Sequence, residues 1–302
     1  MPTMQTTGEL LGSGRSADVY AIDDEWVLRR SRRGDGAASR AALMKYLAGH
    51  GYPVPEVDPA HSACADPETD LVMRRLSGPT MAQAMLDGAM TAEEGGAALG
   101  RLLRQLHSVP APAGLAATAH GGPTARILHL DLHPENVLLT ADGPMVIDRT
   151  NAEVGQPAPD WAMSALVLAQ VALGFPPEVS VGVRRGPTAM LAVAGSDAAD
   201  VVGRLPQARA RRADDPGMSA GRIARLDEAV ALARSAAGSP SCRSAVTPHH
   251  PRKETSDRID EDRRAASGRL RPAAYTAQPQ CGQAFHEACI GSLHEPQLRR
   301  RS

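Results

Sequence analysis

The 302-residue sequence predicts an α+β protein with a small β-rich N-lobe and a larger, mainly helical C-lobe. Three observations lead to this prediction. Residues 9–28 are short apolar stretches broken by glycines and an Asp-Asp turn, as in antiparallel strands. After residue 81, apolar residues recur at helical spacing instead. Residues 77–79, Ser-Gly-Pro, separate the two regions like a hinge, and a hydrophobic fraction of 42% suffices for two modest cores.

The N-lobe is expected over residues 1–78. Its first part alternates strand, glycine turn, strand, turn and strand. Leu43, Tyr46 and Leu47 then lie on one helical face, and Gly51 ends that helix. The predicted ranges are 9–28 for the first three strands, 37–50 for the helix and 70–76 for the next strand.

The C-lobe is expected over residues 79–238. Thr91 and Glu94 have the spacing of a capping box ahead of a leucine-rich helix, and Asp160 is expected to cap an apolar helix that continues to Gly174. Helices are predicted near 81, from 91, over 160–174, 188–202 and 219–237, and short strands over 127–130, 136–139 and 145–147. Residues 239–302 are rich in Ser, Pro, Arg, His and Gln without periodicity, which predicts a disordered tail.

Charge and cysteine content favour a cytoplasmic protein with a small-molecule ligand. The formal net charge is −1 and both signs are mixed along the chain, so no basic stripe indicates nucleic acid or a membrane surface. The four cysteines lie far apart, unlike those of a disulfide-stapled secreted domain. The most apolar run, residues 162–175, is too short to span a bilayer. Nothing in the sequence identifies a protein partner.

The most informative stretch is residues 129–148, which contains Asp131, Asn136 and, after an apolar strand, Asp148. Phosphoryl transfer requires a carboxylate that positions the acceptor hydroxyl and oxygen ligands that hold Mg²⁺ against the phosphates. Asp131 would be the base, with Asn136 and Asp148 as metal ligands. Single residues of these types are common in turns, but three at this spacing favour catalysis. His129 and His133 are expected to brace the loop by hydrogen bonds.

A second candidate element is the glycine hairpin Gly12, Ser13 and Gly14 near the start of the chain. Backbone without side chains can approach phosphate groups and offer them N–H donors. The hairpin fits a phosphate-covering loop except that Ala17 stands where a third glycine is usual. A Gly-x-Gly hairpin is often only a turn, so the phosphate-binding interpretation depends on the position of this hairpin ahead of the Asp131 loop.

These motifs together resemble the aminoglycoside phosphotransferase and choline kinase-like family, especially its actinobacterial members. The resemblance covers roughly residues 8–237 and implies a bilobal protein-kinase-like fold. It also implies ATP as donor, Mg²⁺, a nucleotide-binding N-lobe, and a C-lobe that carries the catalytic loop and the site for a hydroxyl or amine acceptor. The matching segments are Val-Tyr-Ala at 19–21, His-Gly-Tyr-Pro-Val-Pro at 50–55, Leu-Ser-Gly-Pro-Thr at 76–80, the catalytic loop, and Val-Ile-Asp at 146–148.

The sequence departs from the family pattern at three arginines. Arg29 stands where the family has the lysine that grips the α- and β-phosphates, Arg40 where it has the paired glutamate, and Arg149 where tryptophan is common. Arginine keeps the charge of lysine but needs a different approach geometry. The alternative is therefore a catalytically weak or inactive kinase-like protein that binds nucleotide or serves as a scaffold.

The acceptor is left open by the sequence. Residues 176–239, which are expected to line its site, contain at least as many arginines as carboxylates. Such a segment is poorly suited to bind a polycationic antibiotic. A sugar, an amino alcohol or a nucleoside is an equally suitable acceptor.

Overall fold

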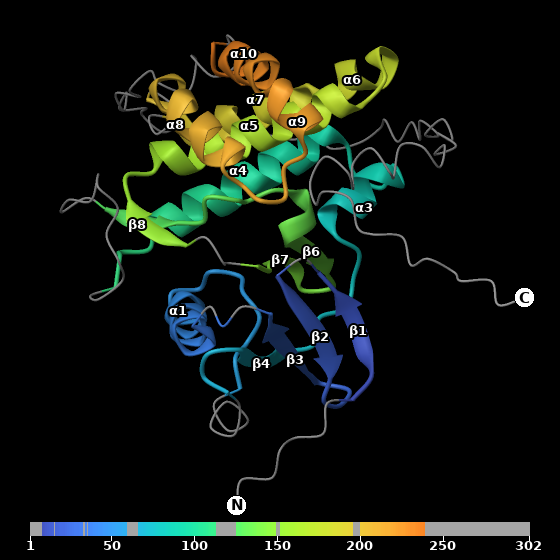
Figure 1. Ribbon diagram of the computed structural model, residues 1–302, viewed down its shortest axis with the longest axis vertical. Coiled ribbons are helices and arrows are strands. Elements are labelled where there is room, and N and C mark those ends of the chain that lie inside the picture. The colour runs from blue at the N-terminus through green and yellow to red at the C-terminus, as the bar shows by residue number, and fades with distance from the viewer. Residues whose placement is uncertain are drawn as a thin grey trace, which may run out of the picture.

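A computed structural model shows a β-sheet at one end of the molecule and a group of helices at the other (Figure 1). The tail after residue 238 and Arg149 lie outside the described residues. The structure describes residues 8–14, 16–32, 34, 36–58, 66–112, 125–148, 152–195 and 200–238.

The N-terminal part is a four-stranded antiparallel sheet in the order β1-β2-β3-β4. Strand β3 is internal, and its residues Val27, Leu28 and Arg29 are buried. Helix α1 contacts β4 and buries one face that includes Leu43 and Leu47. The elements are β1 (Leu10–Ser13), β2 (Ala17–Ala21), β3 (Trp26–Ser31), α1 (Ala37–Gly49) and β4 (Asp70–Arg74).

Residues 75–80, the connector that follows β4, lie against a hairpin formed by β6 (Val137–Thr140) and β7 (Gly143–Val146). The Leu139 N–H donates to the Pro79 carbonyl at 2.9 Å. Gly78 has a φ of +143°, and a Cβ at this position would collide with the Leu139 carbonyl. Only glycine therefore allows the connector to approach the hairpin this closely.

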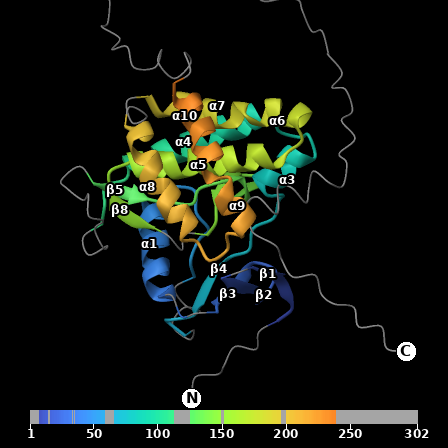
Figure 2. The ribbon, with the colours of Figure 1, turned by 45° about the horizontal axis from the view of Figure 1, so that its top comes forward.

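The C-terminal part is built around α5, whose side chains are almost all buried. Helices α8 and α10 contact α5, and α4 packs along α7. Figure 2 shows α8 and α10 in front of α5. The capping box of Thr91 and Glu94 is present at the start of α4, as predicted. The elements are α3 (Met81–Leu86), α4 (Ala92–Ser108), α5 (Ala158–Gly174), α6 (Pro177–Val183), α7 (Arg185–Ala194), α8 (Val201–Ala213), α9 (Ala220–Ala224) and α10 (Leu226–Ala237).

Several predicted helix boundaries were wrong. Asp160 does not cap α5, because the helix begins at Ala158 and Asp160 lies in its first turn. Helix α7 begins at Arg185 and ends at Ala194, short of the predicted end at residue 202. Helix α8 was not predicted, because its arginines obscure a narrow buried stripe. The helix predicted over residues 219–237 is divided into α9 and α10.

Helices α4 and α7 approach closely at two glycines. A Cβ on Gly96 would collide with the Gly186 carbonyl, and a Cβ on Gly100 would lie 2.7 Å from the Met190 carbonyl oxygen and 2.8 Å from Val193 Cβ. Real Cβ atoms are not found at such distances, so the two backbones meet only because both side chains are absent.

Gly96→Ala is expected to lower the free energy of unfolding by about 2–3 kcal/mol, because overpacking forces α7 away from α4. Chemical denaturation monitored by circular dichroism would measure the change. Gly49→Ala is the matched control, since a Cβ there meets nothing within 4 Å and alanine is the better helix former. Equal stability of the Gly96→Ala variant and the wild type would show that the two helices are more loosely packed.

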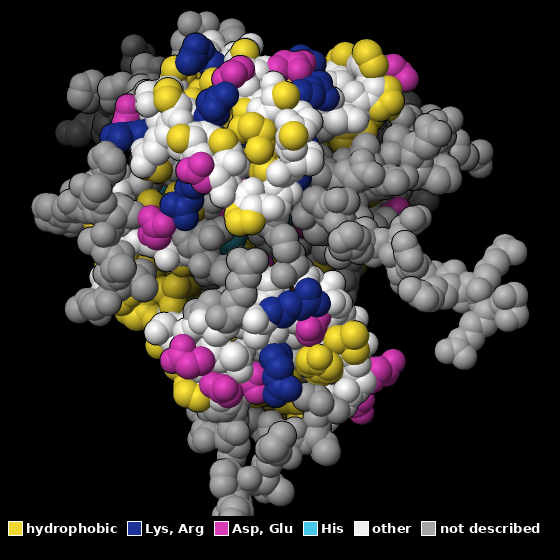
Figure 3. Space-filling view, in the orientation of Figure 1, with side chains coloured by type: hydrophobic (Ala, Val, Ile, Leu, Met, Phe, Trp, Pro, Cys, Tyr) yellow, Lys and Arg dark blue, Asp and Glu magenta, His cyan; other side chains and the backbone are white. Residues whose placement is uncertain are grey.

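The α+β class is confirmed, with strands gathered in the N-terminal region and helices in the C-terminal region (Figure 1). The lobe boundary at residue 78 stays a prediction. Basic and acidic side chains are interspersed over the face shown in Figure 3, which carries no large field of one sign. Within the described ranges, no helix is long and apolar enough to cross a membrane.

Candidate active site

The predicted base and metal ligands lie on one short segment that begins after β5 (Arg126–Leu128) and ends two residues after β7. Strand β5 pairs with β8 (Glu153–Gly155), and a 3₁₀ turn, η1 (Pro134–Asn136), then leads into β6. The side-chain Nδ2 of Asn136 donates to the Asp131 carbonyl at 2.9 Å. The Ile147 N–H donates to the Asn136 carbonyl at 2.9 Å, which brings Asp148 beside them. The structure therefore brings Asp131, Asn136 and Asp148 together.

The loop before Asp131 is held by the buried carboxylate of Asp160. Its Oδ2 accepts hydrogen bonds from the His129 N–H at 2.7 Å and from His107 Nε2 at 3.0 Å, and its Oδ1 accepts from the Leu130 N–H at 2.7 Å. Leu130 has a φ of +61°, which is unfavourable for a leucine. Strained backbone persists only where the surroundings fix it, and Asp160 supplies that constraint.

The charge of Asp160 is favoured although the residue has no exposed surface. Burial alone would raise the pKa of the Asp160 carboxyl. The hydrogen bond from His107, the charges of His107 and His129, and the backbone donors together lower this pKa below its ordinary value. The position of Asp160 in the first turn of α5 acts in the same direction, because a helix N-terminus attracts negative charge.

The Asp131 carboxylate is partly buried, and its two oxygens face two different side chains. Oδ2 lies 3.8 Å from His133 Nε2, and Oδ1 lies 3.7 Å from Arg212 Nη1. Burial raises the pKa of Asp131 above its ordinary value; the charges of His133 and Arg212 oppose the rise, and Asp148 and Asp215 add to it. A carboxylate with a raised pKa is a stronger proton acceptor than one in water.

Arg29 extends from the sheet toward this site. Its buried guanidinium donates from Nη2 to Ser16 Oγ at 3.4 Å and lies 3.8 Å from Asp148 Oδ1. Asp148 has a φ of +43°, so both Asp148 and the residue before Asp131 adopt left-handed backbone. Arg40 lies on the buried face of α1, a helix with no acidic residue in its sequence. The cation on β3 thus has an ion-pair partner on the hairpin, and α1 offers it no carboxylate.

The glycine hairpin connects β1 and β2. Ser13 Oγ donates to Asp18 Oδ1 at 2.7 Å and accepts from Arg32 Nη2 at 2.7 Å, while the Gly14 N–H donates to the Ala17 carbonyl at 2.8 Å. The side-chain hydrogen bonds of Ser13 therefore stay within the sheet. A Cβ on Gly12 would meet nothing within 4 Å, so open space surrounds the start of the hairpin.

Oxygen donors suited to Mg²⁺ are present, but they do not form a complete cage. Asn136 uses its Nδ2 within the loop, so Oδ1 is its remaining atom that could act as a ligand, and the Asp148 side chain is 40% exposed. In the part of the chain that the structure describes, no group of three or more His, Cys, Asp or Glu could hold a metal. An incomplete set of hard oxygen ligands fits Mg²⁺, which usually binds through one or two carboxylates and substrate phosphates.

Sequence reasoning missed three residues of this site: His107, Asp160 and Arg212. Asp160 was interpreted as a helix cap because it precedes an apolar run. His107 lies at the end of the leucine-rich face of α4, which makes it resemble a core position. Arg212 continues the buried stripe of α8 formed by Val201, Leu205 and Ala208, and a charged residue on such a stripe was the available signal.

Comparison with known proteins gives a family match for the first part of the chain. Residues 7–126 match the family model described as the phosphotransferase enzyme family, and the match ends before Asp131. The resemblance inferred from the motifs is thereby confirmed for that region. None of the curated proteins matches this sequence.

Several solved structures are similar in part, although their TM-scores are below 0.5. The chain is 12% identical to APH(2″)-IIa in its gentamicin complex, with a TM-score of 0.48 over 80% of this chain and 94% of that one. ADP-bound aminoglycoside phosphotransferase APH(2″)-Ib is 13% identical, with a TM-score of 0.47 over 75% and 93%. A choline/ethanolamine kinase family protein from Mesorhizobium loti is 19% identical, with a TM-score of 0.44 over 80% and 92%.

Proposed function

We propose that this chain, which resembles the phosphotransferase enzyme family over residues 7–126, transfers the γ-phosphate of ATP to a hydroxyl or amine of a small molecule. One observation carries the proposal. Asp131, Asn136 and Asp148 are gathered on one loop and hairpin, and a buried cation, Arg29, faces Asp148 from the sheet. A base, oxygen ligands and a phosphate-binding cation are the groups that phosphoryl transfer needs.

Each group has a role in the proposed reaction. The acceptor oxygen forms a bond to the γ-phosphorus, the bond from this phosphorus to the β–γ bridging oxygen breaks, and ADP leaves. Asp131 orients the acceptor hydroxyl and takes its proton. Asn136 and Asp148 would hold Mg²⁺, which when bound offsets the negative charge of the phosphates.

The N-terminal part would hold the nucleotide. The glycine hairpin of Gly12, Ser13 and Gly14 is proposed to cover its phosphates, and the Arg29 guanidinium is proposed to bind the α- and β-phosphates in place of a lysine. The hydrogen bonds of Ser13 to Asp18 and Arg32, and the bond from the Gly14 N–H to the Ala17 carbonyl, fix the hairpin, and the open space at Gly12 is where the phosphates would approach.

The second candidate, a weak or inactive nucleotide-binding protein, is favoured by the same contact between Arg29 and Asp148. A fixed cation 3.8 Å from a proposed metal ligand competes with the metal for that carboxylate. The two candidates differ in whether the wild-type protein binds Mg·ATP and forms ADP when it is offered hydroxylated and aminated metabolites.

Arg29→Ala is expected to weaken Mg·ATP binding by roughly 10- to 100-fold, because a charge-assisted contact to the phosphates is lost. Arg29→Lys should bind as well as the wild type or better, and Arg40→Glu should strengthen binding by placing a carboxylate on α1. Titration calorimetry measures these affinities. Arg30→Ala is the matched control, since Arg30 is on the same strand but bonds to Asp70 at the surface.

The outcomes separate the two candidates. Wild-type binding that is lost in Arg29→Ala supports the working phosphotransferase. No wild-type binding, restored by Arg29→Lys together with Arg40→Glu, would show a degenerate kinase. If the two Arg29 variants and the Arg30 control all bind like the wild type, Arg29 does not hold the nucleotide.

A further inference from the structure

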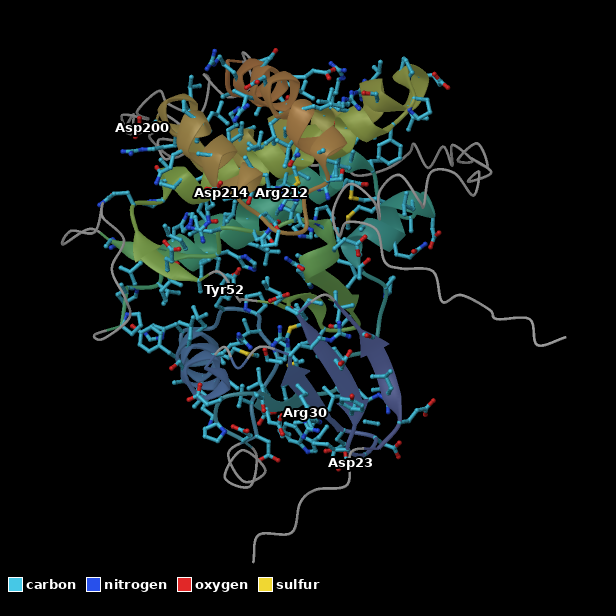
Figure 4. All side chains as sticks on the ribbon, in the orientation of Figure 1. Asp23, Arg30, Tyr52, Asp200, Arg212 and Asp214 are labelled. Atoms are coloured by element: carbon cyan, nitrogen blue, oxygen red, sulfur yellow. The ribbon has the colours of Figure 1, made fainter. Side chains whose placement is uncertain are left out.

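Arg212, on the last turn of α8, has a buried guanidinium with partners on three separate elements. Its side chain is only 5% exposed. Nε donates to Gln170 Oε1 on α5 at 3.1 Å, and Nη1 donates to Asp215 Oδ2 in the turn after α8 at 3.0 Å. The same Nη1 lies 3.7 Å from Asp131 Oδ1. Figure 4 shows Arg212 where α8 and the following loop face the middle of the molecule.

The other ion pairs of α8 are at the surface. They join Arg204 to Asp200, Arg209 to Asp227 and Arg211 to Glu153. In each pair, the side chain of at least one partner is more than a third exposed. Surface pairs of this kind contribute little. Burying a guanidinium, by contrast, has a large desolvation cost unless hydrogen bonds and opposite charges offset it. The buried position of Arg212 therefore implies a task that a surface arginine of α8 could not perform.

The distance to Asp131 is suited to orienting a base without blocking it. At 3.7 Å from Arg212 Nη1, the Asp131 carboxylate is attracted by the guanidinium, and His133 Nε2 lies 3.8 Å from its other oxygen. Within the described residues, it accepts no hydrogen bond of 3.5 Å or less. Its lone pairs therefore stay available for the proton of an acceptor hydroxyl.

We propose that Arg212 is a positioning residue that holds the Asp131 carboxylate in the orientation needed to receive the acceptor proton. The proposal rests on the proposed phosphotransferase function. Gln170 and Asp215 fix the guanidinium from two sides, and the guanidinium in turn acts on Asp131. Arg212 is not assigned to binding the acceptor, because Nε and Nη1 are bonded to these partners and only 5% of its side chain is exposed.

A purely structural role would make a different prediction. If Arg212 only ties α5 to the turn after α8, its removal matters because the Asp215 carboxylate loses its cation. Replacing Asp215 as well removes the carboxylate that Arg212 faced, so stability and catalysis should both recover. If Arg212 positions Asp131, the second substitution restores stability alone.

The test compares Arg212→Gln, Asp215→Asn and the double variant, with Arg209→Gln as a matched control on the same helix. The measurements are Tm, the Kd of Mg·ATP by calorimetry, and the rate of ADP formation from Mg·ATP with water as the acceptor. Arg212→Gln is expected to lower Tm and to slow ADP formation by about 100-fold, as a misplaced catalytic group does, while the Kd changes less than about twofold.

The double variant is expected to regain most of the lost Tm but to keep the slow rate, and Arg209→Gln should match the wild type in all three measurements. Arg212→Lys should recover part of the rate, because it keeps a cation beside Asp131. A double variant that recovers both Tm and rate would overturn the proposal, as would a loss of Mg·ATP affinity as large as the loss of rate. If the folded wild type binds Mg·ATP but forms no ADP with water or any acceptor, the proposed function itself fails, and the role of Arg212 falls with it.

Discussion

Asp131→Asn is expected to reduce phosphoryl transfer by about 100- to 10,000-fold, the range that a general base contributes. The Kd of Mg·ATP should stay nearly unchanged, because Asp131 acts on the acceptor and does not hold the nucleotide. Asparagine keeps the shape of the side chain and removes its ability to take a proton. ADP formation and calorimetry on the same preparation measure the two effects.

Asp148→Ala, unlike Asp131→Asn, should weaken the binding of Mg·ATP. It removes a proposed metal ligand, so ATP affinity should fall in the presence of Mg²⁺ and should change far less in its absence. Asp142→Asn serves as the control, since Asp142 is an exposed residue in the turn between β6 and β7. An equal loss of Mg·ATP affinity in the Asp131 and Asp148 variants would contradict the assigned roles.

Asp160→Asn is expected to have the largest effect on stability, lowering the free energy of unfolding by roughly 3 kcal/mol or more. The carboxylate accepts from two backbone N–H groups and from His107, and an amide can present only one oxygen to these donors. The left-handed Leu130 would then lose part of what holds it. Denaturant unfolding would measure the change.

Ser164→Ala is the control for that experiment, because Ser164 is buried one turn further along the same helix and its hydroxyl has no hydrogen-bond partner in the described structure. It should be neutral or slightly stabilising. An Asp160→Asn variant as stable as Ser164→Ala would show that the loop does not depend on the carboxylate.

The lowered pKa of Asp160 also gives a pH dependence of definite sign. The folded protein binds the Asp160 proton less readily than the unfolded chain does. The stability that results is fully present above the ordinary aspartate pKa of about 4. It is lost as the pH falls through the lower native pKa. The acid limb of the stability curve should therefore be shallower in Asp160→Asn than in the wild type, as Tm measured from pH 6 downward would show.

The sequence predicted the elements whose signals are local. Thr91 and Glu94 indicated the start of α4, and the glycine-broken strands indicated the sheet, because capping and turn preferences act over a few residues. The spacing of Asp131, Asn136 and Asp148 likewise indicated one compact unit. Their closeness follows from a short turn and one hairpin, so it needed no knowledge of the tertiary fold.

The supporting residues could not be predicted in this way, because their partners are distant in the sequence. Asp160 bonds to backbone 30 and 31 residues earlier, and His107 meets it across 53 residues. Nothing near Asp160 distinguishes such a residue from a helix cap. Arg212 is one of several arginines on α8, and only its position on the buried stripe separates it from the others.

The hairpin β6–β7 and the Asp131 loop are attached to different parts of the molecule. The hairpin is bonded through Val146 to the Pro53 carbonyl after α1 and through Leu139 to the connector at Pro79. The Asp131 loop is instead anchored to α5 by Asp160. The hairpin is also bridged to the start of α3 through Leu138 and Thr80, so it is held by several elements while the Asp131 loop is held by α5.

The bond from Asn136 Nδ2 to the Asp131 carbonyl ties the loop to the start of the hairpin. Because in-line transfer requires the phosphate and the acceptor to be aligned, this bond would help to keep the proposed metal ligands and the proposed base in a fixed relation.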